Sequence, residues 1–223
     1  MGHKVNPIGF RLQINKNWQA KWFAKKNYRE NLLSDIEIRN ALDKKFGKTS
    51  GVSLVEIDRS QDAIKIIIHT SKPGILIGRS GQGINDIKMY LVKNCPKLRN
   101  LKTSVVTKIE IEIMEVKNPY LSAELVAQTV AYQVERRIAY KRAIKQSIGK
   151  VIDAKAKGIK IGISGRLGGA EIARREQYGK GSIPLGRLRA NVDFAKVDAL
   201  TTYGMIGVKV WIYKGDQIEQ EEV

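Results

Sequence analysis

The hydrophobic pattern between residues 35 and 69 predicts one helix followed by two strands. Apolar side chains recur at helical spacing over residues 35–46, with Ser34 as the N-cap and Gly47 as the terminator. The next two segments, 52–57 and 63–69, are rich in β-branched residues and are separated by a polar, turn-like stretch. This order predicts a helix that packs on a β-hairpin.

The pattern continues with two helices and a third strand. A helical turn at 72–77 begins with a proline and leads into a glycine-containing loop at 78–81. A longer amphipathic helix covers 84–92 and ends before Pro96. Alternating apolar and charged residues over 105–113 predict a strand with one buried face. The predicted order is helix, strand, strand, helix, loop, helix, strand.

A second domain is predicted beyond the break at residues 117–119. Apolar positions follow the helical period from Leu121 to about Ala156, so a long helical region is expected there. Four strand-like stretches follow, at 159–164, 170–174, 188–194 and 207–213. Glycine-rich turns separate them, at 165–169, 179–181 and Gly186. Helices packed on one antiparallel sheet would satisfy this pattern, which gives an α+β fold class with two domains.

The charge pattern adds two terminal segments to this organisation. The first thirty residues are basic and interleave cations with aromatic side chains, whereas the last ten are acidic and show no apolar pattern. We therefore predict a basic N-terminal arm at 1–34, domains at 35–117 and 118–213, and an acidic, solvated tail at 214–223.

Composition points to a polyanionic partner. The 223 residues include 40 lysines and arginines against 22 acidic residues, which gives a net charge of +18 and a pI near 9.9. Nucleic acid is the first candidate. With Cys95 as its one cysteine and two histidines, the chain cannot supply a zinc finger or an intrachain disulfide, and no metal or cofactor is expected. Without an apolar run of about 20 residues or a signal-like start, we expect a soluble, cytoplasmic protein.

The positive charge is concentrated in one part of the chain. Residues 135–189 hold fifteen lysines and arginines but four acids, an excess of eleven. On the helix predicted there, Arg137, Lys141 and Lys145 repeat every four residues, and Arg142 lies on the same flank. Like charges at this spacing repel, so an external polyanion is a natural counterion. The alternative is a solvated basic face whose aliphatic stems cover the apolar stripe beneath.

The loop Gly78-Arg79-Ser80-Gly81 resembles the GxxG loop that KH domains place between two helices to clamp single-stranded backbone. The bare pattern occurs elsewhere in the chain, but only this copy lies between two predicted helices. Glycines allow a sugar-phosphate backbone to approach, Arg79 adds charge, and helix-terminal N–H groups face an anion. The alternative is a tight helix–helix turn.

Nucleotide-binding and catalytic motifs are not recognisable. The sequence after Gly81 begins a GxG pattern but lacks the third glycine and the preceding strand of a dinucleotide site. The stretch 179–182 lacks the spacing of a P-loop. Neither histidine is accompanied by a nucleophile and a carboxylate, and Glu110 and Glu112 alternate on a solvent face. We therefore predict no enzymatic activity.

Long motifs throughout the chain resemble the family of the bacterial small-subunit ribosomal protein three, the KH-containing protein of the ribosomal head. They cover nearly the whole length, in the order of the family. The motifs are MGHKVNP with GFRL at 1–12, KPGILIGRSG at 72–81, ERR at 135–137, SGRLGGAEIAR at 164–174 and TTYGMIGVKVWI at 201–212.

The resemblance implies a type II KH domain of order αββααβ, which agrees with the order predicted from the pattern. It also implies binding to small-subunit ribosomal RNA, with ribosomal proteins ten and fourteen as neighbours in the head. Ribosomal proteins four and five would share the channel through which mRNA enters. The cations that contact mRNA in the family fall on Lys141, Arg142 and Lys145, where Lys141 replaces an expected arginine and lacks its planar fork.

The candidates for ribosomal RNA contacts follow from charge and from the role of the family. They are Lys4, Arg11, Arg136, Arg137, Arg166, Arg174, Arg175, Arg187 and Arg189. The segment 94–107 is longer than the turn expected in the family. Two other functional classes remain open: a KH-type RNA-binding factor that acts away from the ribosome, and a nuclease, for which no site is visible.

Overall fold

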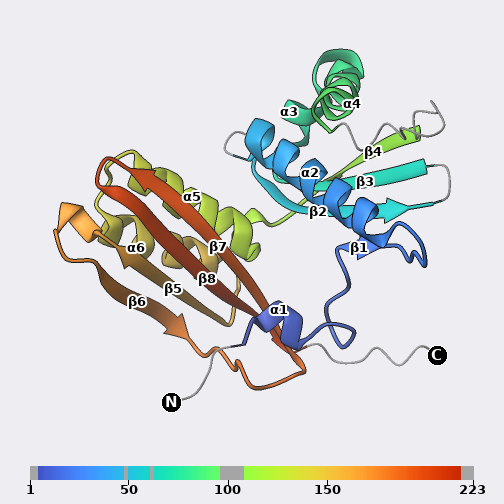
Figure 1. Ribbon diagram of the computed structural model, residues 1–223. Helices are drawn as coiled ribbons and strands as arrows, with labels where there is room; N and C mark the ends of the chain where they lie inside the picture. The colour runs from blue at the N-terminus through green and yellow to red at the C-terminus, as the bar shows by residue number, and fades with distance from the viewer. Residues whose placement is uncertain (1–4, 48–49, 61–62, 96–107, 217–223) are drawn as a thin grey trace. The chain divides into compact units, whose positions relative to one another are not determined.

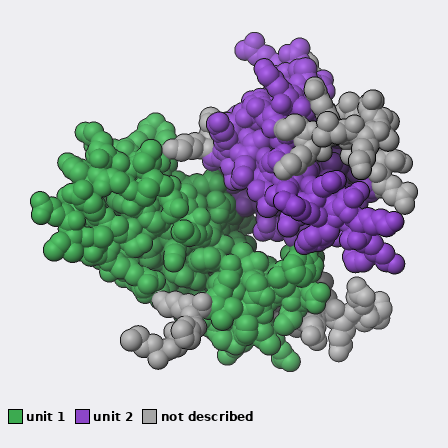
Figure 2. Space-filling view, viewed as in Figure 1, with its two compact units in different colours: residues 1–18, 118–223 green, residues 19–117 purple. Residues whose placement is uncertain are grey.

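The chain forms two compact units (Figure 2). Each unit has its own sheet. The structure, a computed structural model, describes residues 5–47, 50–60, 63–95 and 108–216. One unit comprises residues 19–117, and the other combines 1–18 with 118–223. The chain passes between the units after Trp18 and again after Lys117, and the second passage lies within the boundary predicted at 117–119. The residues predicted to form an N-terminal arm are divided between the two units.

The unit of residues 19–117 has a four-stranded sheet in the order β1-β2-β3-β4 (Figure 1). Its elements are β1 (Ala20–Lys21), α2 (Tyr28–Phe46), β2 (Val52–Arg59), β3 (Ala63–Thr70), α3 (Pro73–Ile77), the 3-10 helix η1 (Arg79–Gly81), α4 (Gln82–Asn94) and β4 (Lys108–Glu115). Strand β3 pairs antiparallel with β2 and parallel with β4. The predicted order of helices and strands is confirmed.

One face of this sheet carries the core of the unit. Ile64, Ile66 and Ile68 alternate along β3 and are buried, because side chains two residues apart share a face of a strand. They pack with Ile38 of α2 and Leu91 of α4 in one hydrophobic cluster. The three helices therefore cover the same face, and the loop between α3 and α4 is held by buried anchors on both sides.

Helix α2 begins at Tyr28, seven residues before the predicted start, and Asn27 rather than Ser34 occupies its N-cap position. Asp35 lies inside the helix and is buried. Its carboxylate accepts hydrogen bonds at 2.7 Å from Nε1 of Trp22 and Nε of Arg59. These partners satisfy the buried charge and explain why the helix extends through a stretch of low hydrophobicity. At the other end Gly47 is the C-cap, as predicted. Of the strand predicted at 105–113, residues 105–107 lie outside the described residues.

The second unit has an antiparallel sheet in the order β6-β5-β8-β7 (Figure 1). Its elements are α1 (Pro7–Phe10), the 3-10 helix η3 (Pro119–Leu121), α5 (Ala123–Glu135), α6 (Tyr140–Asp153), β5 (Gly158–Gly165), the 3-10 helix η4 (Leu167–Gly169), β6 (Arg174–Gly181), β7 (Ala190–Thr201) and β8 (Gly204–Asp216). Ile159, Ile161 and Ile163 of β5 are fully buried against Val130 of α5 and Ile144 of α6. Helices thus cover one face of an antiparallel sheet, which confirms the α+β prediction.

The long helical region predicted at 121–156 is in fact two helices. Arg137 has a left-handed backbone, with φ of 62°, so the helix cannot continue through it. The N–H of Ile138 turns back to the carbonyl oxygen of Gln133, and the carboxylate of Glu135 accepts the N–H of Leu200 from β7 at 3.1 Å. This elbow at residues 136–139 redirects the basic helix α6 relative to α5.

Strand β6 lies later in the chain than the predicted strand at 170–174. It covers Arg174–Gly181 and therefore includes the predicted turn at 179–181. Gly181 pairs with Gly158 of β5, and a Cβ at Gly181 would lie 2.4 Å from the carbonyl oxygen of Lys157. These glycines permit close strand approach instead of ending the strand.

Strands β7 and β8 are longer than predicted and form a hairpin. The predicted strands at 188–194 and 207–213 lie within or overlap them, and Lys214–Asp216 belong to β8 although they were assigned to the acidic tail. Residues 217–223 of that tail lie outside the described residues. The face of this sheet opposite α5 and α6 is partly covered by α1 and by the β6–β7 loop.

Candidate nucleic-acid interface

The loop between α3 and α4 depends on glycine at three positions. Gly78 and Gly81 have φ of +68° and +77°, in the left-handed region that glycine adopts without steric cost. A Cβ at Gly83 would lie 2.3 Å from the carbonyl oxygen of Leu76, so only glycine lets the start of α4 approach α3 so closely. The sequence therefore specifies a tight, preformed bend.

The surface of this bend offers a cation beside apolar side chains. Arg79 is exposed and forms no ion pair with any residue that the structure describes. Ile75 and Ile77 of α3 are 49% and 37% exposed, although Leu76 between them is buried. An exposed cation, exposed aliphatic groups and the backbone N–H groups at the start of α4 are suited to a nucleic-acid strand. The side chain of Ser80 is outside the description.

Helix α6 presents a second basic surface. Ala143, Ile144, Ser147 and Val151 are buried, so the helical period places Lys141, Arg142 and Lys145 in solvent. Over the described parts of the chain none of these three cations forms an ion pair. The three residues proposed from the sequence therefore share one exposed surface, which we call the α6 basic face.

A hydrogen-bonded cluster that the sequence did not suggest holds the first turn of α6 against β6. One carboxylate oxygen of Glu176 accepts from the hydroxyl of Tyr140 at 3.1 Å, and the other accepts from the hydroxyl of Tyr178 at 2.6 Å. Arg174 adds an ion pair, with its Nε 3.3 Å from Glu176. The bond from Tyr178 lowers the pKa of Glu176, and the same bond raises the pKa of Tyr178 to about 12.

Two further candidate arginines lie at the elbow between α5 and α6. Arg136 is exposed and its guanidinium lies 4.3 Å from the ring centroid of Tyr132, a cation–π contact that orients it. Arg137 is exposed beside it. Arg166 is partly buried, and its Nε donates to the carbonyl oxygen of Ala170 at 2.9 Å. Its remaining donors leave it partly available to a phosphate.

The other arginines named from the sequence are exposed and belong to strand β6 and the β6–β7 loop. Arg174 and Arg175 begin β6, and Arg187 and Arg189 lie in the loop. Arg187 pairs with Asp216 at 2.9 Å, yet its side chain remains 60% exposed. Of the whole set, Lys4 lies outside the described residues.

Arg11 is a correction to the predicted set. It is fully buried, and its guanidinium donates to the carbonyl oxygens of Pro184, Leu185 and Arg187 at 3.1, 2.9 and 2.8 Å. Burial lowers its pKa from the usual value. A side chain enclosed in this way cannot reach an external phosphate, so Arg11 is a structural clamp on the β6–β7 loop. Asn15 assists it by donating to the carbonyl oxygens of Leu188 and Ala190.

Neither a metal centre nor a membrane-spanning helix emerges from the structure. Within the described residues, no three histidine, cysteine or acidic side chains are grouped as a metal site. No described helix combines the length and the apolar character needed to cross a bilayer. The His69 imidazole, on the inner strand β3, lies 3.3 Å from a carboxylate oxygen of Glu56 on β2.

Comparison with known proteins links both units to one family. Residues 37–121 match the family model described as KH domain, and residues 130–212 match the model described as Ribosomal protein S3, C-terminal domain. Three relatives named Small ribosomal subunit protein uS3 align over almost the whole chain. The relative from Hydrogenovibrio crunogenus is 47% identical over 99% of this chain and 92% of its own length. Those from Clostridium botulinum strain Okra and Caldicellulosiruptor saccharolyticus are 49% and 47% identical, over 97% and 99% of this chain and 93% and 96% of their lengths.

Proposed function

The chain belongs to the family of the small ribosomal subunit protein uS3, whose members are structural components and not enzymes, and we propose that it binds ribosomal RNA in the head of the subunit and contacts mRNA where it enters. It is accordingly a ribosome-bound protein of the cytoplasm.

The observation that carries the mRNA assignment is the α6 basic face. The exposed cations Lys141, Arg142 and Lys145 lie within about one helical turn, and none of them forms an ion pair among the described residues. Their mutual repulsion is relieved when phosphates approach. Because the Glu176 cluster fixes the first turn of α6, these cations are presented from a rigid support rather than from a loop.

Ribosomal RNA binding is supported by the remaining exposed arginines and by the GxxG loop. Arg136, Arg137 and Arg174 extend the positive surface around α6. Arg175 lies on the opposite face of β6, and Arg187 and Arg189 project from the loop clamped by Arg11. Arginine suits phosphate because its planar fork donates two parallel hydrogen bonds. The loop at 78–81 adds a site for single-stranded backbone.

We propose that the chain also contacts other ribosomal proteins within the subunit. Ribosomal proteins ten and fourteen would adjoin the chain in the head, and ribosomal proteins four and five would complete the channel for incoming mRNA. An excess of eleven positive charges lies within residues 135–189, so this part of the chain can contact RNA while other faces meet proteins.

Sedimentation of a tagged copy from cell extract tests this function. We expect near one-to-one recovery with small subunits and intact ribosomes, both before and after a high-salt wash. A chain recovered mainly in the free fraction, or removed by the wash, would instead indicate an RNA-binding factor that acts away from the ribosome. Contacts with the four named proteins are then read by chemical crosslinking of the purified subunits.

A further inference from the structure

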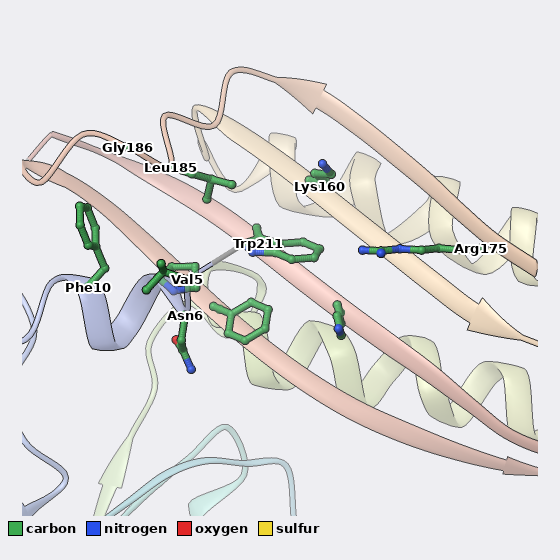
Figure 3. A pocket seen from close by; sticks show the side chains of 11 residues that line it. Val5, Asn6, Phe10, Lys160, Arg175, Leu185, Gly186 and Trp211 are labelled. Carbon is green, nitrogen blue, oxygen red and sulfur yellow. The ribbon is translucent and has the colours of Figure 1, made fainter. Parts of the chain in front are cut away.

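A pocket of about 490 Å³ opens on the face of the second unit's sheet that α5 and α6 leave uncovered (Figure 3). Strands β5, β6 and β8 supply Lys160, Arg175 and Lys209, and Trp211 lies at its centre. Segment 5–10 and the β6–β7 loop close the opposite side. A volume of this size lies in the range of small-ligand sites.

Strand register explains why these side chains share one face. Lys160 is directly opposite Trp211, and Gly162 is opposite Lys209, while the intervening Ile161 points to the helices and is fully buried. Arg175 is opposite Ser164, two residues further along β5. The alternation that fills the core with isoleucine therefore gathers the three cations on the other face.

Trp211 shares the apolar part of the pocket with Phe10, which is 40% exposed, and with Phe194. Its ring packs at 5.2 Å from the ring of Phe194 on β7, and the Nζ of Lys160 lies 5.8 Å from the ring centroid. Trp211 is 7% exposed, so the ring is fixed in place and only a small part of it faces the pocket. A fixed aromatic surface costs little conformational entropy when a ligand contacts it.

The cations of the pocket lack counterions. No acidic side chain lines it, and Lys160, Arg175 and Lys209 form no ion pair with any residue in the described ranges. Other cations on the same sheet do: Lys196 pairs with Asp198, and Lys214 with Asp193. A site that combines three unpaired cations with an aromatic ring is complementary to an anionic group attached to a planar, apolar one.

We propose that this pocket holds one unstacked nucleotide of single-stranded RNA, with its base against the exposed ring of Phe10 and the small exposed part of Trp211. Its flanking phosphates lie at Lys160, Arg175 and Lys209. The inference rests on the proposed RNA-binding function and adds a site that lies in neither the GxxG loop nor the α6 basic face. Base contact with an aromatic ring and phosphate contact with nearby cations is the general mode of single-strand recognition. An acidic peptide would satisfy the cations but would leave the aromatic surface without a matched planar partner.

The first test places a spectroscopic probe in the pocket. The full chain is labelled with 5-fluorotryptophan, and the ¹⁹F resonance of Trp211 is assigned from the variant Trp211→Phe. Twelve-residue oligoriboadenylate should shift this resonance, whereas an abasic oligomer with the same number of phosphates should leave it in place. An equal shift with both oligomers, or no shift while the adenylate binds, would refute placement of a base at Trp211.

The second test removes the cations. Replacement of Lys160, Arg175 and Lys209 by glutamine should lower the salt slope of oligoriboadenylate binding by about 2 units, because each lost contact with a single strand contributes about 0.7. A matched control replaces Lys150, Lys180 and Lys196 by glutamine. These residues are exposed but do not line the pocket, so their replacement should lower the salt slope far less.

The outcomes separate this inference from the proposed function. If the pocket variant binds RNA with an unchanged slope and still enters ribosomes, the inference is wrong while the ribosomal role stands. If it binds RNA normally but no longer assembles with purified ribosomal RNA and proteins, the pocket holds a protein, which also overturns the inference. If the unaltered chain neither binds RNA nor sediments with ribosomes, the proposed function itself fails.

Discussion

The guanidinium of Arg11 donates a hydrogen bond of 2.8 Å to the carbonyl oxygen of Arg187, which lies 176 residues later in the chain. The same nitrogen also reaches Pro184 and Leu185. A buried side chain near the start of the chain thus fixes the loop that carries two exposed candidate arginines, Arg187 and Arg189. This relationship makes the N-terminal segment part of the second unit and lets it position two arginines that we propose to contact RNA.

Replacement of Arg11 by methionine should destabilise the second unit by about 3 kcal/mol, because three partly buried carbonyl oxygens lose a charged donor. Chemical denaturation monitored by the ¹⁹F resonance of Trp211 in the 5-fluorotryptophan-labelled chain measures the effect, and amide exchange of residues 185–190 should speed up. The exposed Arg142→Met serves as the control and should change stability by less than about 0.5 kcal/mol. Equal effects of the two substitutions would contradict the clamp.

Acid should loosen the contact between α6 and β6. The pKa of Glu176 is lowered mainly by the hydroxyl of Tyr178, so its stabilising contribution is complete above the ordinary glutamate pKa and is lost as the pH falls through the lowered value. The variant Glu176→Gln should therefore be less stable than the unaltered chain at neutral pH, and the two stabilities should converge in acid. Thermal unfolding between about pH 7 and pH 3 measures this.

Alkaline titration of Tyr178 tests the same hydrogen-bonded cluster. Tyr178 has its pKa raised to about 12 by the hydrogen bond to Glu176, so its contribution is complete below pH 10 and is lost as the pH rises through about 12. The NMR signal of Tyr178, assigned from Tyr178→Phe, should titrate near that value. In Glu176→Gln the midpoint should move toward 10, and an unmoved midpoint would exclude the hydrogen bond as its cause.

The local pattern of apolar residues was sufficient to predict the helices and strands that bury a single face. The alternation of Ile64, Ile66 and Ile68 predicts a half-buried strand, and the helical spacing around Ile144 predicts both the buried and the basic side of α6. The GxxG loop was predictable because glycines at 78 and 81 meet a local backbone requirement. In each case the decisive interactions are close together in the sequence.

The features that were missed depend on partners far away in the chain. The sequence predicts Arg11 as a surface cation, whereas in the structure it is enclosed by the carbonyl oxygens of the loop at 184–187. Strand β6 is an edge strand with mostly exposed residues, so no apolar alternation marks it, and its register is set by pairing with β5. The helix break at Arg137 has no local signal, because an arginine is not expected in a left-handed conformation.

The bend between α3 and α4 should tolerate alanine at Gly74 but not at Gly83. A Cβ at Gly83 would overlap the carbonyl oxygens of Leu76 and Ile77, at 2.3 and 2.8 Å, and the helices would have to move apart at a cost of about 1–3 kcal/mol. A Cβ at Gly74 would meet no atom within 4 Å beyond its neighbours in the chain, and alanine in a helix is more favourable than glycine by about 0.5–1 kcal/mol. Thermal unfolding of both full-length variants measures the contrast, and equal stabilities would show that the bend is not tightly packed.

The GxxG loop should contribute one phosphate contact through Arg79. The substitution Arg79→Asp keeps the glycines, so the fold should be retained, while the salt slope of binding to a short single-stranded RNA falls by about 0.7. The substitution Lys25→Asp, in an exposed segment outside the helices and strands, gives a control with the same change of charge. If both variants bind equally, the loop is a structural turn and not an RNA contact.

The α6 basic face should act on mRNA without supporting the fold. Replacement of Lys141, Arg142 and Lys145 by alanine removes mutual repulsion and leaves the buried side of the helix intact, so stability and incorporation into subunits should be preserved. Binding to single-stranded RNA should lose about 2 units of salt slope. Translation of messages with a hairpin near the start codon should fall, while unstructured messages are translated normally.

A control that removes the same charge distinguishes position from net charge. Lys150, Lys180 and Lys196 are exposed on the same unit, and their replacement by alanine should spare structured messages. Lys141 offers a finer comparison, because Lys141→Arg supplies the planar fork that suits phosphate and should raise translation through hairpins above the unaltered level. Equal translation of structured and unstructured messages by the triple α6 variant would separate this face from mRNA and leave it as a contact for ribosomal RNA.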